Sequence, residues 1–216
     1  MGVKGSTDIF MHDIDSVIAK IREKIDIENL QKILTLRNEV EEMHRENHVK
    51  INHSIIELVI ANHLIGAGFN TNLEYKVNGI SADVYAEKGL GTIIVEVETG
   101  FVPPDNALDP LLYLRARIAS KIVRYSNFAN KFILATPPYY ILQIPACLTK
   151  PPRFRTNEEI EAIKRLCDLY YSNPQVNLEE IRNARLHAVY IVDVDNVTVR
   201  EWEVNEYIGK ASLWST

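Results

Sequence analysis

Two tight-turn signals in the middle of the chain constrain its fold more than any other feature. Asn78-Gly79 and Gly89-Leu90-Gly91 separate three short segments of strand-like pattern, at 73–77, 80–87 and 92–98. Asn-Gly between alternating residues is the strongest short-range hairpin signal, because these residues tolerate the positive φ angles of a tight turn. The region therefore predicts a three-stranded antiparallel meander.

Helical patterns precede the meander. In the first 68 or so residues, apolar side chains recur at near-helical spacing in three segments. Ser6 or Thr7 could cap the first segment, and Gly66 and Gly68 would end the third. We expect three consecutive helices here.

The rest of the chain alternates helices and strands. Residues 111–128 predict a helix and 132–135 a buried strand, an order typical of a crossover to a parallel neighbour. The proline-rich segment 137–155 predicts an irregular excursion. Helices at 158–171 and 178–186 would follow, and residues 187–204 would then form a strand and a hairpin arm.

Length and composition fit one α/β domain. The chain has 216 residues, of which 46% are hydrophobic and 25% are charged. We expect a single domain over 1–216, with a helical extension at 1–48, a core at 49–136 and further helices and strands at 137–216. No apolar run approaches the ~20 residues that span a bilayer. The first residues lack the apolar segment of a signal peptide, so we expect no membrane association and a cytoplasmic location.

The most informative side chains are three carboxylates in the meander. Asp83 begins one strand, and Glu96 and Glu98 end the next. Because side chains alternate along a strand, Glu96 and Glu98 share a face and Val97 points to the other. The turn at 89–91 brings Asp83 close to Glu96.

Like charges in the apolar stretch TIIVEV must be protonated, paired or bound to a cation. Carboxylate oxygens suit Mg²⁺ or Mn²⁺. The competing interpretation is a solvated strand face with no metal.

Glu57 on the third helix, Asp83, and Glu96-Val97-Glu98 together resemble the core motif of the PD-(D/E)XK nuclease superfamily. The order helix-β-β-β-α-β over residues 50–136 resembles the core order of that superfamily. The resemblance is greatest to archaeal Holliday-junction resolvases and related endonucleases, and a protein of an archaeal virus, acting in the host cytoplasm, is one identity consistent with it. It implies a restriction-endonuclease-like mixed β-sheet core flanked by helices, with the N-terminal helices as an extension.

The resemblance also implies roles for residues. Asp83, Glu96 and the Val97 carbonyl would bind the metal, and Glu57 would bind or orient a second metal or its water. Glu98 departs from the family, which mostly has lysine at this position; it could act as a general base or an additional ligand. Lys121, on the helix after the motif, is the candidate that would supply the missing positive charge at the catalytic site.

Basic residues on that helix predict nucleic-acid contact. Arg117, Lys121 and Arg124 follow i, i+4, i+7 spacing, and Arg115 is near in sequence. They would bind the DNA backbone beside the metal, although a solvated helix face is the alternative. Lys150, Arg153 and Arg155 form a second basic group among prolines, which could bind phosphate or lie on a plain surface loop.

Two other groups could bind metal in principle. His44, His48 and His53 do not match a zinc-protease pattern, and a solvated helix end is the favoured interpretation. Cys147 and Cys167 predict two reduced or buried thiols rather than a disulfide or a zinc site.

The sequence thus predicts a Mg²⁺- or Mn²⁺-dependent DNA endonuclease, selective for branched or junction DNA and homodimeric as the resemblance implies. The alternative is a catalytically weak or inactive nuclease-fold protein that binds DNA or assembles other proteins. The net charge of −5 favours this alternative, as does Glu98 in place of lysine.

Overall fold

The computed structural model of the protein describes residues 3–46, 51–171 and 173–214. Its elements, in chain order, are α1 (Val3–Arg22), α2 (Ile27–Arg45), α3 (Ile51–Gly66), β1 (Asn70–Val77), β2 (Ile80–Lys88), β3 (Gly91–Val97), α4 (Pro110–Tyr125), β4 (Lys131–Thr136), α5 (Ala146–Thr149), α6 (Asn157–Asp168), α7 (Leu178–Asn183), β5 (Ala188–Asp193), β6 (Thr198–Trp202) and α8 (Val204–Trp214). Short 3₁₀ turns lie at Pro104–Asn106 and Pro152–Phe154.

The strands form one six-stranded mixed sheet in the order β1-β2-β3-β4-β5-β6. The first three pair antiparallel, which confirms the predicted meander. Strands β3, β4 and β5 run parallel, and β6 returns antiparallel to β5. The crossovers are α4 between β3 and β4, and the segment with α5–α7 between β4 and β5. The fold class is therefore the predicted one, and its architecture is compatible with a nuclease-like fold.

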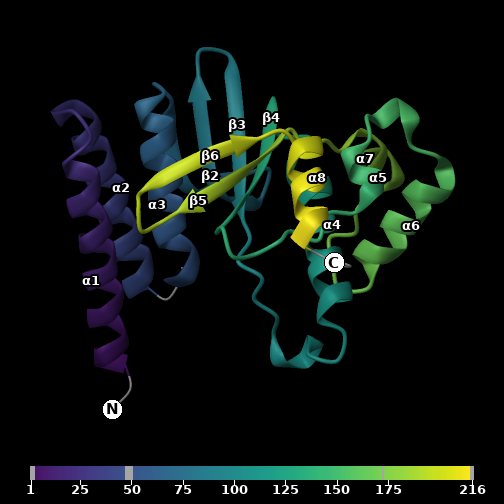
Figure 1. Ribbon diagram of the computed structural model, residues 1–216, viewed down its shortest axis with the longest axis horizontal. Coiled ribbons are helices and arrows are strands. Elements are labelled where there is room, and N and C mark those ends of the chain that lie inside the picture. Colours follow the sequence, from purple (N-terminus) through teal and green to yellow (C-terminus); the bar gives the residue numbers. More distant parts are fainter. Residues whose placement is uncertain (1–2, 47–50, 172, 215–216) are drawn as a thin grey trace.

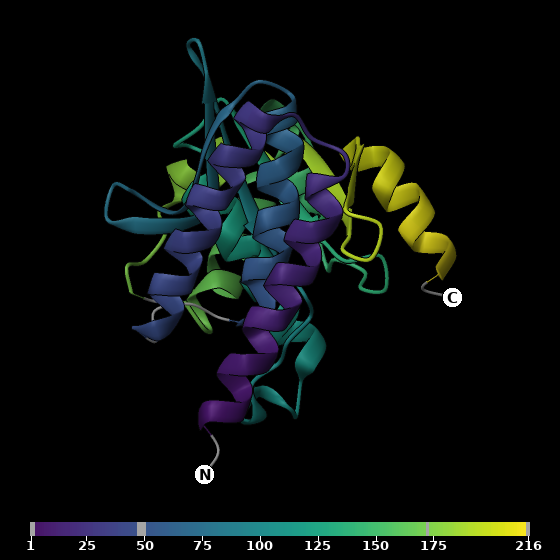
Figure 2. The ribbon, with the colours of Figure 1, turned by 90° about the vertical axis from the view of Figure 1, so that its left-hand side faces the viewer.

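Helices cover both faces of the sheet. In Figure 1, α1–α3 lie to the left of the sheet and α4–α7 to the right, and Figure 2 shows α1–α3 in front of the strands. Val95 and Val97 pack in the core beneath α1–α3, whereas Ile94 packs in the core beneath α4 and α6. Because both faces are covered, β3 is apolar almost throughout. The N-terminal helices are thus packed against the sheet.

Polar caps fix where several helices begin. The Asp26 carboxylate accepts the Asn29 N–H at 2.9 Å at the start of α2, and Asp109 accepts the Leu112 N–H at 3.1 Å before α4. Thr156 forms a reciprocal capping box at the start of α6. The predicted cap at Ser6 or Thr7 is wrong, because α1 already begins at Val3.

The largest error in the predicted elements is at the C-terminal end. The hairpin arm ends at Trp202, and α8 follows immediately, which the sequence analysis did not predict. Elsewhere the predicted helices and strands are found with shifted ends, and α5 adds one short turn.

Two expectations about chain chemistry can also be compared with the structure. Cys147 and Cys167 are both buried free thiols, as predicted. In the described part of the chain, no helix combines the length and the apolar character needed to cross a membrane.

Candidate functional site

The carboxylates lie where β2 and β3 stop pairing as ordinary strands. The regular register ends at Val84 opposite Val95, and the next residues are Asp83 and Glu96. Beyond this pair, hydrogen bonds to the Asp83 and Glu96 side chains take the place of the regular backbone hydrogen bonds between the two strands. The Asp83 N–H donates to Glu96 Oε1 at 3.0 Å, and the Val97 N–H donates to Asp83 Oδ2 at 2.7 Å. The two acids therefore satisfy the backbone of each other's strand as well as facing the site.

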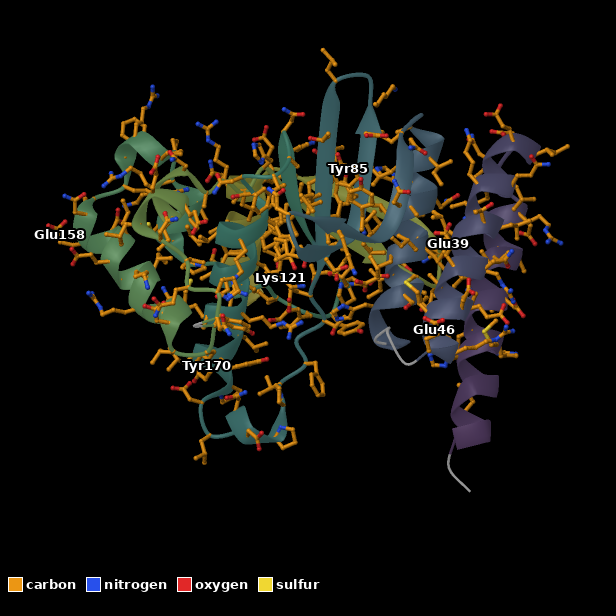
Figure 3. All side chains as sticks on the ribbon, turned by 180° about the vertical axis from the view of Figure 1, so that it is seen from behind. Glu39, Glu46, Tyr85, Lys121, Glu158 and Tyr170 are labelled. Atoms are coloured by element: carbon orange, nitrogen blue, oxygen red, sulfur yellow. The ribbon has the colours of Figure 1, made fainter. Side chains whose placement is uncertain are left out.

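The Lys121 ammonium lies at the centre of four oxygens. Its Nζ is 3.3 Å from Asp83 Oδ2, 3.0 Å from Glu96 Oε2, 2.9 Å from Glu98 Oε1 and 2.8 Å from the Val97 carbonyl oxygen. Figure 3 shows Lys121 deep in the molecule, between α4 and the strands. The Lys121 ammonium thus contacts all three predicted carboxylates and the Val97 carbonyl, which lies between Glu96 and Glu98 in the sequence.

Glu98 has a second cationic partner. Arg117 Nε donates to Glu98 Oε1 at 2.8 Å and Oε2 at 2.9 Å, and the glutamate side chain is 1% exposed. A charge-assisted contact to both oxygens fixes the carboxylate in place. A lysine at position 98 would lie beside the two cations Lys121 and Arg117, which would repel it. The negative charge of Glu98 is instead attracted by both of them.

A further carboxylate, Glu57, faces the site from α3. It is fully buried, and neither of its oxygens has a hydrogen-bond partner in the described part of the chain. Atoms of His53, Glu57 and Asp83 lie within 4.8 Å of one another. His53 Nδ1 is 4.0 Å from Asp83 Oδ2. Because buried polar atoms are normally paired, the bare oxygens of Glu57 call for a proton or a cation.

Burial and like charge decide the protonation of two of the glutamates. Burial, followed by the charge of Asp83, raises the pKa of Glu57 well above its ordinary value. Burial and Asp83 also raise the pKa of Glu96, to about 8. Both glutamates therefore favour the neutral form in the absence of a further cation.

The charges that persist in the centre are those for which attraction to opposite charges outweighs burial. For Asp83, burial works to raise the pKa, but the Lys121 ammonium, His53 and the Val97 N–H together lower it. Burial works to lower the pKa of Lys121, yet the surrounding carboxylates hold it well above its ordinary value. For Arg117, Glu98 likewise outweighs burial and raises the pKa. Burial lowers the pKa of His53, which leaves a neutral imidazole able to bind a metal.

These residues fit a divalent cation. Carboxylate oxygens and a backbone carbonyl are the donors that Mg²⁺ and Mn²⁺ prefer. Asp83, Glu96 and the Val97 carbonyl converge on one position, and Glu57, whose carboxylate has no partner among the residues described, lies beside it. That position coincides with the Lys121 ammonium, so a cation held by this full set requires the ammonium to move.

The predicted cationic face on α4 is distributed differently. Arg117 and Lys121 turn inward to the carboxylates. Arg124 Nη2 donates to the carbonyls of Tyr171 at 2.9 Å and Pro174 at 2.7 Å, so it fastens a loop. Arg115 is exposed and lines a groove beside α8 instead. The four basic residues therefore do not form one surface for DNA.

His53 is a residue of the site that the sequence analysis missed. It was expected on a solvated helix end, but it is 7% exposed and lies beside Asp83. The signal was present, because His53 and Glu57 are four residues apart and share one face of α3. His44 packs instead against the Phe10 ring at 4.1 Å between centroids, and His48 lies outside the described residues.

Comparisons with known proteins add one distant similarity. No protein family model and no curated protein matches the chain. Among solved structures, the crystal structure of an XisH family protein from Nostoc punctiforme is similar at 17% identity and a TM-score of 0.33. The similarity covers 69% of this chain and 98% of that chain.

Proposed function

We propose that the protein is a metal-dependent endonuclease that hydrolyses phosphodiester bonds in DNA. One observation carries the proposal. The Asp83, Glu96 and Glu98 carboxylates and the Val97 carbonyl converge on one cation position, beside a buried Glu57 whose two oxygens are unpaired among the described residues. Such a set has a chemical use at a phosphodiester, where negative charge develops and water must be activated.

The proposed roles follow from these contacts. Asp83, Glu96 and the Val97 carbonyl would hold Mg²⁺ or Mn²⁺, with Glu57 and His53 on its other side. The cation would supply Lewis-acid stabilisation of the phosphate and a bound water of lowered pKa. Lys121, once displaced from the oxygens, would neutralise a phosphate oxygen, and Arg117 would keep Glu98 oriented.

The proposal extends to the substrate class and the assembly. Branched or junction DNA is the substrate that we propose, and a homodimer would present two sites to two strands. Both extensions rest on the resemblance of the motif to junction-cutting enzymes.

A specific observation favours a second candidate function, that of a nuclease-fold protein that binds DNA or assembles other proteins without cutting. Lys121 and Arg117 already neutralise the carboxylates from within the chain. If the ammonium never leaves, the centre is a structural ion cluster.

Cleavage of labelled four-way-junction, flap, duplex and single-stranded DNA in Mg²⁺ and in Mn²⁺ tests the proposal. The variant Asp83→Asn keeps the shape of the side chain and removes its charge, so we expect at least a 100-fold loss of rate. Glu87→Gln is the matched control, because Glu87 is an exposed acid on the same strand, and its rate should stay within twofold of wild type.

The outcomes separate the two candidates. Metal-dependent cutting that Asp83→Asn abolishes and Glu87→Gln retains supports the endonuclease. Absence of cutting by wild type on all four substrates contradicts it, and DNA binding that Asp83→Asn retains would then support the non-cutting candidate.

A further inference from the structure

A second charged region lies far from the carboxylates, in a cavity of about 490 Å³. We call it the arginine pocket and define it by five of its lining residues: Lys150, Arg153, Arg155, Arg185 and His187. None of the described residues that line it carries a carboxylate. In a chain whose net charge is −5, this is a local concentration of positive charge.

The position of the arginine pocket separates it from the candidate metal centre. His187 immediately precedes β5, and its N–H donates to the carbonyl of Phe132 near the start of β4. Glu98 instead follows the end of β3. Because β3, β4 and β5 are parallel, the two sites lie at opposite ends of the sheet.

Arg155 gives the pocket a buried charge that forms no direct ion pair in the described chain, where Glu159 acts on it from a longer distance. Its side chain donates to five main-chain carbonyls, those of Cys147, Leu148, Lys150, Ile181 and Arg182, at 2.8–3.3 Å. The residue is 5% exposed. The carbonyls satisfy its N–H groups without neutralising its charge, which the more distant Glu159 offsets in part, and a buried charge of this kind favours a nearby anion.

The same five bonds make the pocket rigid. They connect α5 and its C-terminal Lys150 to the end of α7, so both walls are held by one guanidinium. Arg155 has no N–H left for a ligand, and its contribution is structural and electrostatic.

Other side chains carry the donors that can reach a ligand. Arg153 and Arg185 are exposed at the rim, and no carboxylate partner is found for either in the described chain. His187 Nδ1 accepts the Phe132 N–H at 3.0 Å, so the ring proton is on Nε2, which is available as a donor. Lys150 is paired with Glu159 and is less available.

We propose that the arginine pocket binds two adjacent phosphate groups, either the diphosphate of a nucleotide or consecutive phosphates of a nucleic-acid strand. Planar guanidinium groups match phosphate oxygens in pairs. Arg153, whose guanidinium lies over the Phe154 ring, and Arg185 have no carboxylate partner in the described chain, so each can take one phosphate. The His187 N–H adds a directed neutral donor, and the buried charge of Arg155 attracts the anion. The proposal does not depend on the endonuclease activity.

Calorimetric titration with pyrophosphate at low salt tests the pocket on the full chain. We expect saturable binding by wild type and at least tenfold weaker binding by the double variant Arg153→Ala, Arg185→Ala. Arg165→Ala is the control, since Arg165 is a 71% exposed arginine on α6 outside the pocket, and its affinity should equal that of wild type. Absence of saturable binding by wild type, or unchanged binding by the double variant, would overturn the proposal.

A nucleoside diphosphate and a ten-nucleotide single strand then identify the source of the phosphates. Tighter binding of the strand, with affinity falling steeply as salt rises, assigns the pocket to nucleic acid. Tighter binding of the nucleoside diphosphate assigns it to a nucleotide. As a check that needs no variant, pyrophosphate should protect Arg153 and Arg185 of wild type from phenylglyoxal, and equal labelling with and without it would contradict the proposal.

Discussion

The two ends of the sheet treat buried charge in opposite ways. At the candidate metal centre, Lys121 and Arg117 meet the carboxylates at 2.8–3.3 Å, so the chain supplies its own counter-ions. At the arginine pocket, the Arg155 guanidinium is hydrogen-bonded to neutral carbonyls and lies among further cations, and Glu159 acts on it from a longer distance. The comparison shows that the number of buried charges does not indicate which site needs a bound ion or ligand. What indicates it is whether side chains of opposite charge within the chain neutralise those charges. Of the residues at the metal centre, Glu57 is the one left in need of a bound ion or ligand.

The largest expected effect comes from removing the shared counter-ion. Lys121→Met would leave Asp83 and Glu96 without the ammonium and Glu98 with Arg117 alone, and breaking a buried ion cluster costs about 3–5 kcal/mol of the free energy of unfolding. Urea denaturation measures the loss. Lys164→Met is the control, because Lys164 pairs with Asp168 in a more exposed position, where the cost is about 0–1 kcal/mol.

The same variant tests whether a metal can take the place of the ammonium. Mn²⁺ at about 100 times its dissociation constant should raise the free energy of unfolding of Lys121→Met by about 2.7 kcal/mol. Wild type should gain less, because its ammonium competes for the same oxygens. Equal gains in both proteins, or a loss no larger than that of Lys164→Met, would show that Lys121 does not occupy the cation position.

An intermediate effect is expected in the pH dependence of stability. The pKa of Glu57 in the folded protein lies above its ordinary value of 4.5. The contribution of neutral Glu57 to the free energy of unfolding is therefore fully present below pH 4.5 and is lost as pH rises through the folded pKa. The glutamine in the variant Glu57→Gln cannot ionise. The free energy of unfolding of the variant, relative to that of wild type, should therefore rise by up to about 1.4 kcal/mol for each pH unit above 4.5.

Urea denaturation between pH 5 and 8 measures this difference. Glu39→Gln is the control, since Glu39 is an exposed acid on α2, at the surface in Figure 3. Its pH profile should run parallel to that of wild type. A parallel profile for Glu57→Gln as well would mean that Glu57 is not held neutral.

The smallest effect is expected at the arginine pocket. Arg185→Glu would introduce the carboxylate that the pocket lacks, at an exposed position, and should stabilise the fold by about 0.2–1 kcal/mol at low salt. The gain should vanish at about 1 M salt, where screening is strong. A destabilisation at low salt would show that the positive charge of the pocket is already compensated.

The sequence predicted the part of the site that depends on strand geometry. Alternation along β3 and the turn at 89–91 were sufficient to place Asp83 beside Glu96, and the register of β2 and β3 has this arrangement. The α/β class followed from the order of helical and strand-like patterns along the chain, and the mixed nuclease-like sheet was expected from the resemblance. Strand alternation and tight turns are local features, so a pattern of a few residues determines them.

Contacts between distant elements were less predictable. Whether Lys121 reaches the strands depends on how α4 is rotated and tilted, which its own sequence does not specify. Its neighbour Arg124, at similar spacing, bonds instead to the carbonyls of Tyr171 and Pro174. Helix α8 was missed although Val204, Tyr207, Ile208 and Ala211 have helical spacing, because the segment directly follows a strand.

The reciprocal bonds between Asp83 and Glu96 affect how this chain can change over evolutionary time. Because each side chain completes the backbone bonding of the opposite strand, selection for folding alone would retain both acids after any catalytic use had ended. The Glu57 carboxylate makes no hydrogen bond within the described chain and so has no such structural protection. Among relatives of this protein, the residue at position 57 should therefore distinguish catalytically active sites from inactive ones better than the presence of Asp83 and Glu96 does.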